Sequence, residues 1–151
     1  LIKAYQDILE LKLMETLREQ EGGTYGASVY STLTKRPTEV ATFYVYFDCD
    51  PERVEKLVSI VHQEIEKIIN NGITATDLDK VKTSYLKDVK EEKEYTSYQL
   101  NVLYYIEGYN KDDAKNNVDL INAIQPQDVQ NFAKSMMENA QSFEIIFKPK
   151  K

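Results

Sequence analysis

The sequence predicts an α+β fold in which helices pack on one face of a mainly antiparallel sheet. Residues 27–48 contain two runs rich in Val, Thr, Tyr and Phe with alternating side-chain character, as is typical of strands. Before and after these runs, apolar residues recur every three or four positions, which is the spacing of amphipathic helices. The predicted order is helix, strand, strand, helices, strand. With 151 residues, the chain can bury a hydrophobic core, and we expect one domain over residues 1–151.

The first helix is predicted from a stripe of large apolar residues that ends at two glycines. Gly22 and Gly23 follow the stripe, as glycine does just beyond a helix end. Strands are expected over residues 27–34 and 40–48, and residues 35–38 join them into an antiparallel hairpin. The apolar stripe of the helix consists of Ile2, Tyr5, Leu9, Leu13 and Leu17.

The second strand is predicted to have two different faces. One face carries Phe43, Val45 and Phe47, and the other carries Thr42, Tyr44 and Tyr46.

A run of helices is predicted between the hairpin and a closing strand. Asp50 and Pro51 supply an N-cap and a first-turn proline for the second helix, and residues 70–72 end it. Thr74, or alternatively Thr76 with Asp77, caps a third helix that reaches about residue 94. Further helices are expected at 95–108, at 111–123 and from 125 onward, followed by a strand over 142–148 in which Phe143, Ile145 and Phe147 alternate with other residues. Such a narrow sheet would have exposed edges.

Composition and charge argue against two classes of function. The formal net charge is −6, and Lys and Arg are interleaved with acidic residues, which disfavours nucleic-acid binding. No apolar run approaches the roughly 20 residues that a membrane-spanning helix needs. Cys49 is the only cysteine, so neither an intramolecular disulfide nor a Cys-based zinc site is expected.

The residues that usually carry catalysis are sparse. Neither helical zinc signature, H-E-x-x-H or H-x-x-E-H, is present. We interpret the single histidine, His62, as a partly exposed helix residue whose partner at helical spacing is Glu66. Cys49 reads as a small packed residue rather than a nucleophile. The glycine-rich residues 22–26 follow a helix and enter a strand, which is the reverse of the context of phosphate-binding loops.

The same glycine-rich segment carries the most informative pattern. Residues 17–26, Leu-Arg-Glu-Gln-Glu-Gly-Gly-Thr-Tyr-Gly, place a tyrosine seven positions after an arginine. The segment resembles the motif of the C-terminal lobes of pitrilysin/insulinase-type zinc peptidases. The resemblance extends through residues 50–54, 72–82 and 124–129. On this basis, and because the chain starts without methionine inside a predicted helix, we expect most of a C-terminal lobe of a longer peptidase, with the first strand of the lobe upstream.

The resemblance implies a division of labour between two similarly folded lobes. One lobe of the parent enzyme binds zinc on an inverted H-x-x-E-H helix, where the metal and a glutamate activate water, whereas the present lobe binds no metal and is inactive alone. By position, Arg18 and Tyr25 would hold the substrate and stabilise the oxyanion from across a closed chamber. The expected partners are a peptide substrate and a zinc-binding N-terminal lobe or partner subunit. The candidate substrate-binding residues are Gly23, Thr24, Tyr30, Tyr44 and Tyr46.

Several alternatives stay open on the sequence alone. Without the resemblance, Arg18 would complement the dipole at the helix C-terminus, and Tyr25 would be an ordinary aromatic residue at the start of a strand. A non-catalytic relative would keep the fold and act as a binding or structural subunit, and an unrelated α+β interaction module is a third hypothesis. The exposed sheet edges would also permit a homo-oligomer. The compartment is left open, with export to the periplasm compatible with a bacterial parent.

Overall fold

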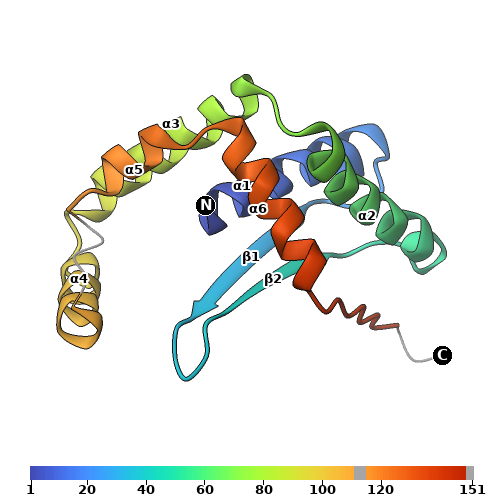
Figure 1. Ribbon diagram of the computed structural model, residues 1–151. Helices are drawn as coiled ribbons and strands as arrows, with labels where there is room; N and C mark the ends of the chain where they lie inside the picture. Colours follow the sequence, from blue (N-terminus) through green and yellow to red (C-terminus); the bar gives the residue numbers. More distant parts are fainter. Residues whose placement is uncertain (111–114, 149–151) are drawn as a thin grey trace. The chain divides into compact units, whose positions relative to one another are not determined.

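The computed structural model describes residues 1–110 and 115–148 (Figure 1). Two compact units are present, Leu1–Ile73 with Pro126–Lys151 and Thr74–Gln125. Helices and an antiparallel sheet make an α+β fold, as predicted, whereas the single domain expected over the whole chain stays a prediction. In chain order the elements are α1 (Ile2–Leu13), η1 (Met14–Gln20), β1 (Ala27–Thr34), β2 (Val40–Phe47), η2 (Pro51–Arg53), α2 (Val54–Asn71), α3 (Ala75–Glu92), α4 (Thr96–Tyr109), α5 (Asn117–Ala123) and α6 (Pro126–Asn139).

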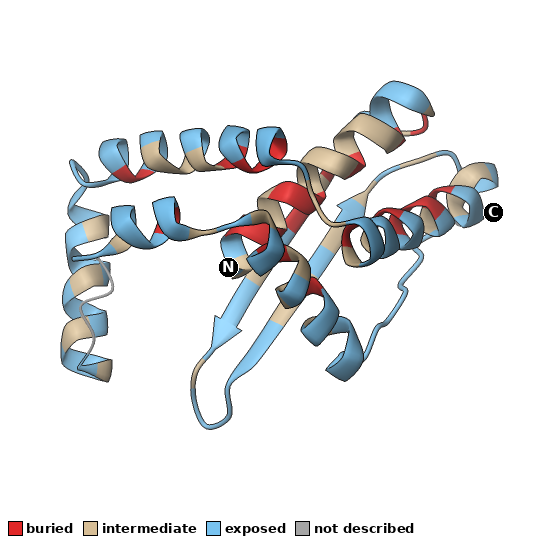
Figure 2. Ribbon diagram, turned by 45° about the horizontal axis from the view of Figure 1, so that its top comes forward, coloured by how far each residue is buried: buried red, intermediate tan, exposed pale blue. Residues whose placement is uncertain are grey.

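The core of the first unit lies between the hairpin and a layer of helices. Helix α1 packs against β1, and α2 and α6 pack against α1 (Figure 1). The ring of Tyr5 on α1 lies 5.3 Å from that of Phe43 on β2 and 5.8 Å from that of Phe132 on α6, centroid to centroid. Figure 2 shows the buried residues on the inward sides of the helices and the hairpin tip exposed. The helices therefore cover the hairpin face that carries Phe43.

The first helix follows the predicted apolar stripe but changes its winding. Tyr5, Leu9, Leu13 and Leu17 are all buried, as the spacing predicts. From Met14 to Gln20, however, the helix is wound as a π-helix, η1, rather than an α-helix. The bond from the amide of Glu21 to the carbonyl of Thr16, 3.0 Å long, spans five residues, which is the π spacing. The segment that holds Arg18 is therefore wider than the helix before it.

The hairpin has the predicted pairing. Strands β1 and β2 run antiparallel in a register from Ala27 opposite Phe47 to Thr34 opposite Val40. Two side chains of α1 tie β1 to the helix: Ser31 donates from Oγ to Gln6 Oε1 at 2.6 Å, and the amide of Val29 donates to Glu10 Oε2 at 2.7 Å. Glu10 thereby satisfies a backbone donor on the free edge of β1, which the sheet alone leaves unpaired.

Asp50 caps the short 3-10 helix η2 that leads into α2, and Gly72 ends α2 as expected from the sequence. The Asp50 carboxylate accepts a hydrogen bond from the amide of Glu52 at 3.0 Å, and α2 ends at Gly72, whose φ of 75° suits glycine. Gln130 of α6 donates from Nε2 to the carbonyl of Ile69 at 2.8 Å. This bond satisfies a carbonyl in the last turn of α2 and holds α6 beside it.

The predicted closing strand over residues 142–148 is wrong. In the described part of the chain the sheet has two strands, β1 and β2, and residues 140–148 form neither helix nor strand. Phe143, Ile145 and Phe147 are 83, 76 and 92% exposed. Alternation of apolar side chains fits a strand, but a strand also needs a backbone partner, and this segment has none within the described residues. His62 bonds Glu144 of this segment, Nε2 to Oε1 at 2.8 Å, rather than the predicted Glu66.

The secondary-structure elements in the described part of the second unit are all helices. Thr74, and not Thr76, caps α3: its Oγ1 accepts from the amide of Asp77 at 3.1 Å. Helices α3 and α5 run side by side, and Lys82 donates to the carbonyl of Asn122 at 2.9 Å (Figure 1). Residues 111–114 of the predicted helix 111–123 lie outside the described residues, and the remainder forms α5 from Asn117. In the described residues, no helix combines the length and the apolar character that crossing a membrane requires.

Candidate functional site

The end of η1 and the loop that joins it to β1 present the two residues that the sequence motif singled out. Arg18 is exposed on η1, next to the buried Leu17, and Tyr25 lies just before β1. The π winding places Arg18 differently from an α-helical residue, because a π-helix has more residues in each turn. Such segments inside α-helices occur frequently at functional sites. The apolar spacing of the sequence predicted a helix here but did not predict that Arg18 lies in a π-helical segment.

The backbone of this loop is fixed at both ends. Gly22 has a φ of 57°, which glycine adopts without strain, and its amide bonds the carbonyl of Arg18 at 3.1 Å. Around Tyr25, the hydroxyl of Thr24 donates to the carbonyl of Gly26 at 2.8 Å and accepts from its amide at 3.2 Å. The backbone on either side of Tyr25 is thus hydrogen-bonded, while the Tyr25 side chain is 99% exposed.

Neither Arg18 nor Tyr25 is held by a side-chain hydrogen bond or ion pair within residues 1–110 and 115–148. Arg18 lies on η1 and Tyr25 in the loop before β1, and within the described residues no hydrogen bond joins their side chains. Both donors are therefore available to a ligand. The roles expected for them stay predictions.

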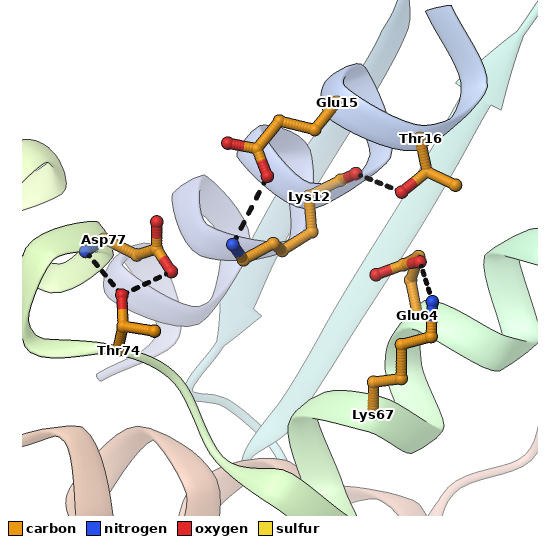
Figure 3. A network of polar contacts seen from close by, with 7 residues as sticks. All are labelled: Lys12, Glu15, Thr16, Glu64, Lys67, Thr74 and Asp77. Carbon is orange, nitrogen blue, oxygen red and sulfur yellow. Dashed lines mark hydrogen bonds and ion pairs between the residues drawn. The ribbon is translucent and has the colours of Figure 1, made fainter. Parts of the chain in front are cut away.

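The polar side chains drawn in Figure 3 are satisfied by partners three or four residues away in the sequence. Lys12 pairs with Glu15 at 3.3 Å, and Thr16 donates to the carbonyl of Lys12 at 3.0 Å. On α2, the buried Glu64 pairs with Lys67 at 2.7 Å. In the second unit, Thr74 donates to the Asp77 carboxylate at 2.7 Å. These contacts span three or four residues and stabilise helices.

The outer face of the hairpin carries the predicted group of tyrosines. Tyr30 stands opposite Tyr44 in the register, and Tyr46 stands opposite Ser28; all three tyrosines are exposed. Tyr46 donates to Asp48 Oδ1 at 2.8 Å, and this hydrogen bond, reinforced by the carboxylate charge, raises the pKa of the Tyr46 phenol. The opposite face of β2 turns Phe43 into the core. The predicted alternation of β2 is confirmed.

Of the other two candidate residues, Thr24 is half-buried and Gly23 is buried. A Cβ placed on Gly23 would lie 2.7 Å from Leu57 Cδ2, so the backbone of Gly23 rests directly on α2. The close contact of Gly23 with Leu57 therefore places the loop backbone against α2. Its expected contact with substrate stays a prediction.

One contributor to this site was missed by reasoning from the sequence. Arg53, at the end of η2, donates from Nη1 to the carbonyl of Gly22 at 3.2 Å and from Nη2 to that of Glu21 at 3.0 Å. The Glu21 carboxylate also pairs with Arg53 at 3.5 Å and with Lys56. The sequence placed Arg53 in a helix opening, but nothing local to it indicates a partner more than thirty residues away.

Zinc does not fit the residues that the structure describes. Within residues 1–110 and 115–148, no group of three or more His, Cys, Asp and Glu side chains could hold a metal ion, whereas zinc sites in proteins take three or four protein ligands. His62 is bonded to Glu144, and Cys49 is a half-buried free thiol.

Comparison with solved structures identifies the class of fold. The periplasmic protease PqqL from Escherichia coli matches with a TM-score of 0.70 and 19% identity, over 87% of this chain and 15% of that one. A conserved protein from Enterococcus faecalis V583 matches with a TM-score of 0.76 and 19% identity, over 88% of this chain and 32% of that one. At these identities the likeness shows the fold, an α+β lobe that is also found within a protease.

The sequence itself shows the family. Residues 2–85, more than half of the chain, match the family described as the peptidase M16 inactive domain, and the chain belongs to that family. This confirms the resemblance to pitrilysin/insulinase-type peptidases. The probable zinc protease PqqL of Haemophilus influenzae is 34% identical over 67 residues, which are 44% of this chain and 7% of that protein. The chain thus spans a small part of the length of the relatives it matches.

Proposed function

We propose that this chain is the substrate-facing C-terminal lobe of a zinc-dependent endopeptidase that hydrolyses peptides in a closed chamber. One observation carries the proposal: Arg18 on η1 and Tyr25 in the loop that follows are both exposed and have no side-chain polar partner in the described chain. Membership of the M16 inactive-domain family supports a peptidase parent. In this proposal zinc lies on another lobe, because the described part of this chain offers no fitting set of ligands.

The two side chains suit the stabilisation of an oxyanion. When water attacks a peptide carbonyl, negative charge develops on the carbonyl oxygen. The Tyr25 hydroxyl can donate one directed hydrogen bond to that oxygen, and the Arg18 guanidinium offers permanent charge and several donors. One donor of this kind contributes about 2.7–4 kcal/mol to the rate enhancement. The loop backbone is already held by hydrogen bonds, so it is the two exposed side chains that must be ordered when the substrate binds.

The outer face of the hairpin supplies a surface for the rest of the substrate. Tyr30 and Tyr44 are cross-strand partners, and Tyr46 lies on the same exposed face. Their rings combine apolar area with a hydroxyl, which suits an extended peptide of mixed sequence. In this proposal Thr24 and Gly23 border the same surface at the loop. The substrate is thus held by the tyrosines and polarised at the loop.

The complete enzyme would supply the remaining parts. A zinc-binding N-terminal lobe, fused or as a partner subunit, would face this lobe across the chamber, and an upstream strand would extend the two-stranded sheet. The similarity to a periplasmic protease of Escherichia coli supports a periplasmic location. This chain alone would then be inactive.

Peptide cleavage by the complete enzyme tests the proposal. Arg18→Ala and Tyr25→Phe should each lower kcat by about 100-fold, the usual loss on removing one oxyanion donor. The matched controls are Glu19→Gln, an exposed neighbour of Arg18, and Tyr95→Phe, an exposed tyrosine of the second unit; both should keep full activity. Unchanged cleavage in the first two variants would show that the assigned roles are wrong.

A second function, a non-catalytic binding or structural subunit, is favoured by the description of the family as an inactive domain. The complete reading frame and its neighbours decide between the two. A peptidase requires an inverted H-x-x-E-H motif on a facing lobe. If no such motif exists, Arg18→Ala and Tyr25→Phe should weaken the binding of peptides that are never cleaved.

A further inference from the structure

Arg53 contacts the loop between η1 and β1 with a planar fork of donors. Its two terminal nitrogens reach successive carbonyls, those of Gly22 at 3.2 Å and Glu21 at 3.0 Å. These carbonyls lie at the C-terminal end of η1, where backbone oxygens lack helical partners and carry partial negative charge. One cationic side chain from η2 thus satisfies two peptide groups just before Tyr25.

The contact leaves little freedom for the peptide units between Arg53 and Tyr25. A Cβ on Gly23 would lie 2.7 Å from Leu57 Cδ2 and 3.4 Å from Arg53 Cζ, so the loop backbone is seated on the first turn of α2 and on the guanidinium itself. Beyond Gly23, the hydroxyl of Thr24 makes two hydrogen bonds with the backbone of Gly26. Tyr25 is therefore a fully exposed side chain on a backbone that Arg53 holds.

We propose that Arg53 is a positioning residue, which fixes the backbone from which Tyr25 reaches the substrate. The inference rests on the proposed function of Tyr25 and adds to it the group that sets the placement of the tyrosine. Displacement of a catalytic group by about 1 Å can cost 100-fold in rate. Arg53 acts through the loop and has no part in the chemistry.

Arginine is specifically suited to this role. Its guanidinium is planar and presents N–H donors in a rigid fork, whereas lysine is a single charged point on a flexible stem. Lysine at position 53 could keep the ion pair with the Glu21 carboxylate but could not bridge both carbonyls in one plane. Lys56 is a natural comparison, because it pairs with the same carboxylate of Glu21 but with neither carbonyl.

A double-mutant cycle in the complete enzyme tests the proposal. Tyr25→Phe alone should lower kcat by about 100-fold. Arg53→Lys alone should lower kcat by about tenfold with KM nearly unchanged. In the Tyr25→Phe background, Arg53→Lys should lower kcat by less than about twofold. Arg53→Lys acts by displacing the Tyr25 hydroxyl, and the phenylalanine variant has no hydroxyl to displace. Lys56→Ala should leave kcat unchanged.

The outcomes separate the two levels of the argument. If Tyr25→Phe alone has full activity, the proposed function fails and the cycle is not needed. If Tyr25→Phe is impaired but Arg53→Lys is fully active, or costs the same factor with and without the tyrosine hydroxyl, the positioning role is overturned. An equal loss in Lys56→Ala would also overturn it, by assigning the effect to charge. Arg53→Gln, which keeps a donor for one carbonyl, replaces Arg53→Lys if the latter does not fold.

Discussion

The buried hydroxyl of Tyr5 gives the sharpest test of the core. The Tyr5 side chain is completely buried between α1, β2 and α6, and its hydroxyl has no hydrogen-bond partner within the described residues. A buried polar group without a partner costs about 1–3 kcal/mol relative to a satisfied one. Tyr5→Phe keeps the edge-to-face contacts with Phe43 and Phe132 and removes only that oxygen. We expect the free energy of unfolding to rise by about 1 kcal/mol.

The same group should make stability depend on alkaline pH. Burial raises the pKa of Tyr5 from 10 to about 12. Between these values the folded chain keeps its proton while the unfolded chain loses it, so the folded state is progressively disfavoured. The stability that the protonated Tyr5 contributes to the folded state is fully present below pH 10 and is lost as the pH rises through about 12. The difference between the two pKa values corresponds to about 3 kcal/mol.

Denaturant unfolding of the chain at pH 7 and across pH 10–12 measures both effects. Tyr5→Phe should be more stable than the unaltered chain at pH 7, and its stability should fall less steeply above pH 10. Tyr30→Phe is the matched control, because it removes an exposed hydroxyl from the outer face and should change stability by less than about 0.5 kcal/mol. A Tyr5→Phe variant that is less stable at pH 7 would refute the reasoning, since it would mean that the hydroxyl is satisfied.

Two further predictions concern the site loop and the cap of α3. Gly23→Ala should lower the free energy of unfolding by about 1–2 kcal/mol, because its Cβ would lie 2.7 Å from Leu57. The control is Gly108→Ala, which should not destabilise the chain because a Cβ there meets nothing within 4 Å. Equal losses for the two variants in thermal unfolding would contradict the packing described. Thr74→Ala should speed amide hydrogen exchange at the start of α3 through a loss of about 1 kcal/mol, whereas Thr76→Ala should not; the opposite result would move the N-cap to Thr76.

Features that depend on neighbouring residues could be predicted from the sequence. The apolar stripe of α1, the Asp50 cap and the end of α2 at Gly72 each follow from residues a few positions apart. The antiparallel pairing of the hairpin also follows, because two strand-like runs lie a few residues apart in the sequence; the register itself was not predicted. The closing strand failed for the complementary reason. Alternation in residues 142–148 shows which side chains would share a face, but it does not supply a backbone partner.

At the candidate site, the sequence motif predicted the functional residues, and the structure shows the contacts that hold the loop backbone beside them. Arg18 and Tyr25 were predicted from the pattern around the glycines, and the structure shows both exposed. The burial of Gly23 and the hydrogen bonds of Arg53 could not be predicted from the sequence, because each depends on contacts between distant segments. The π winding of η1 is local, but the apolar spacing that predicted a helix did not distinguish it from an α-helix. His62 illustrates the same limit: helical spacing favoured Glu66, and the partner is Glu144.

The central claim, that Tyr25 donates to the oxyanion rather than to the bound peptide, is tested most directly with a phosphinic peptide that mimics the tetrahedral intermediate. For the complete enzyme, Tyr25→Phe should raise the Ki of this inhibitor by about the factor by which it lowers kcat/KM, about 100-fold, with KM for the matching substrate nearly unchanged. If kcat/KM falls while the Ki stays at its original value, the hydroxyl does not stabilise the transition state and the account is contradicted.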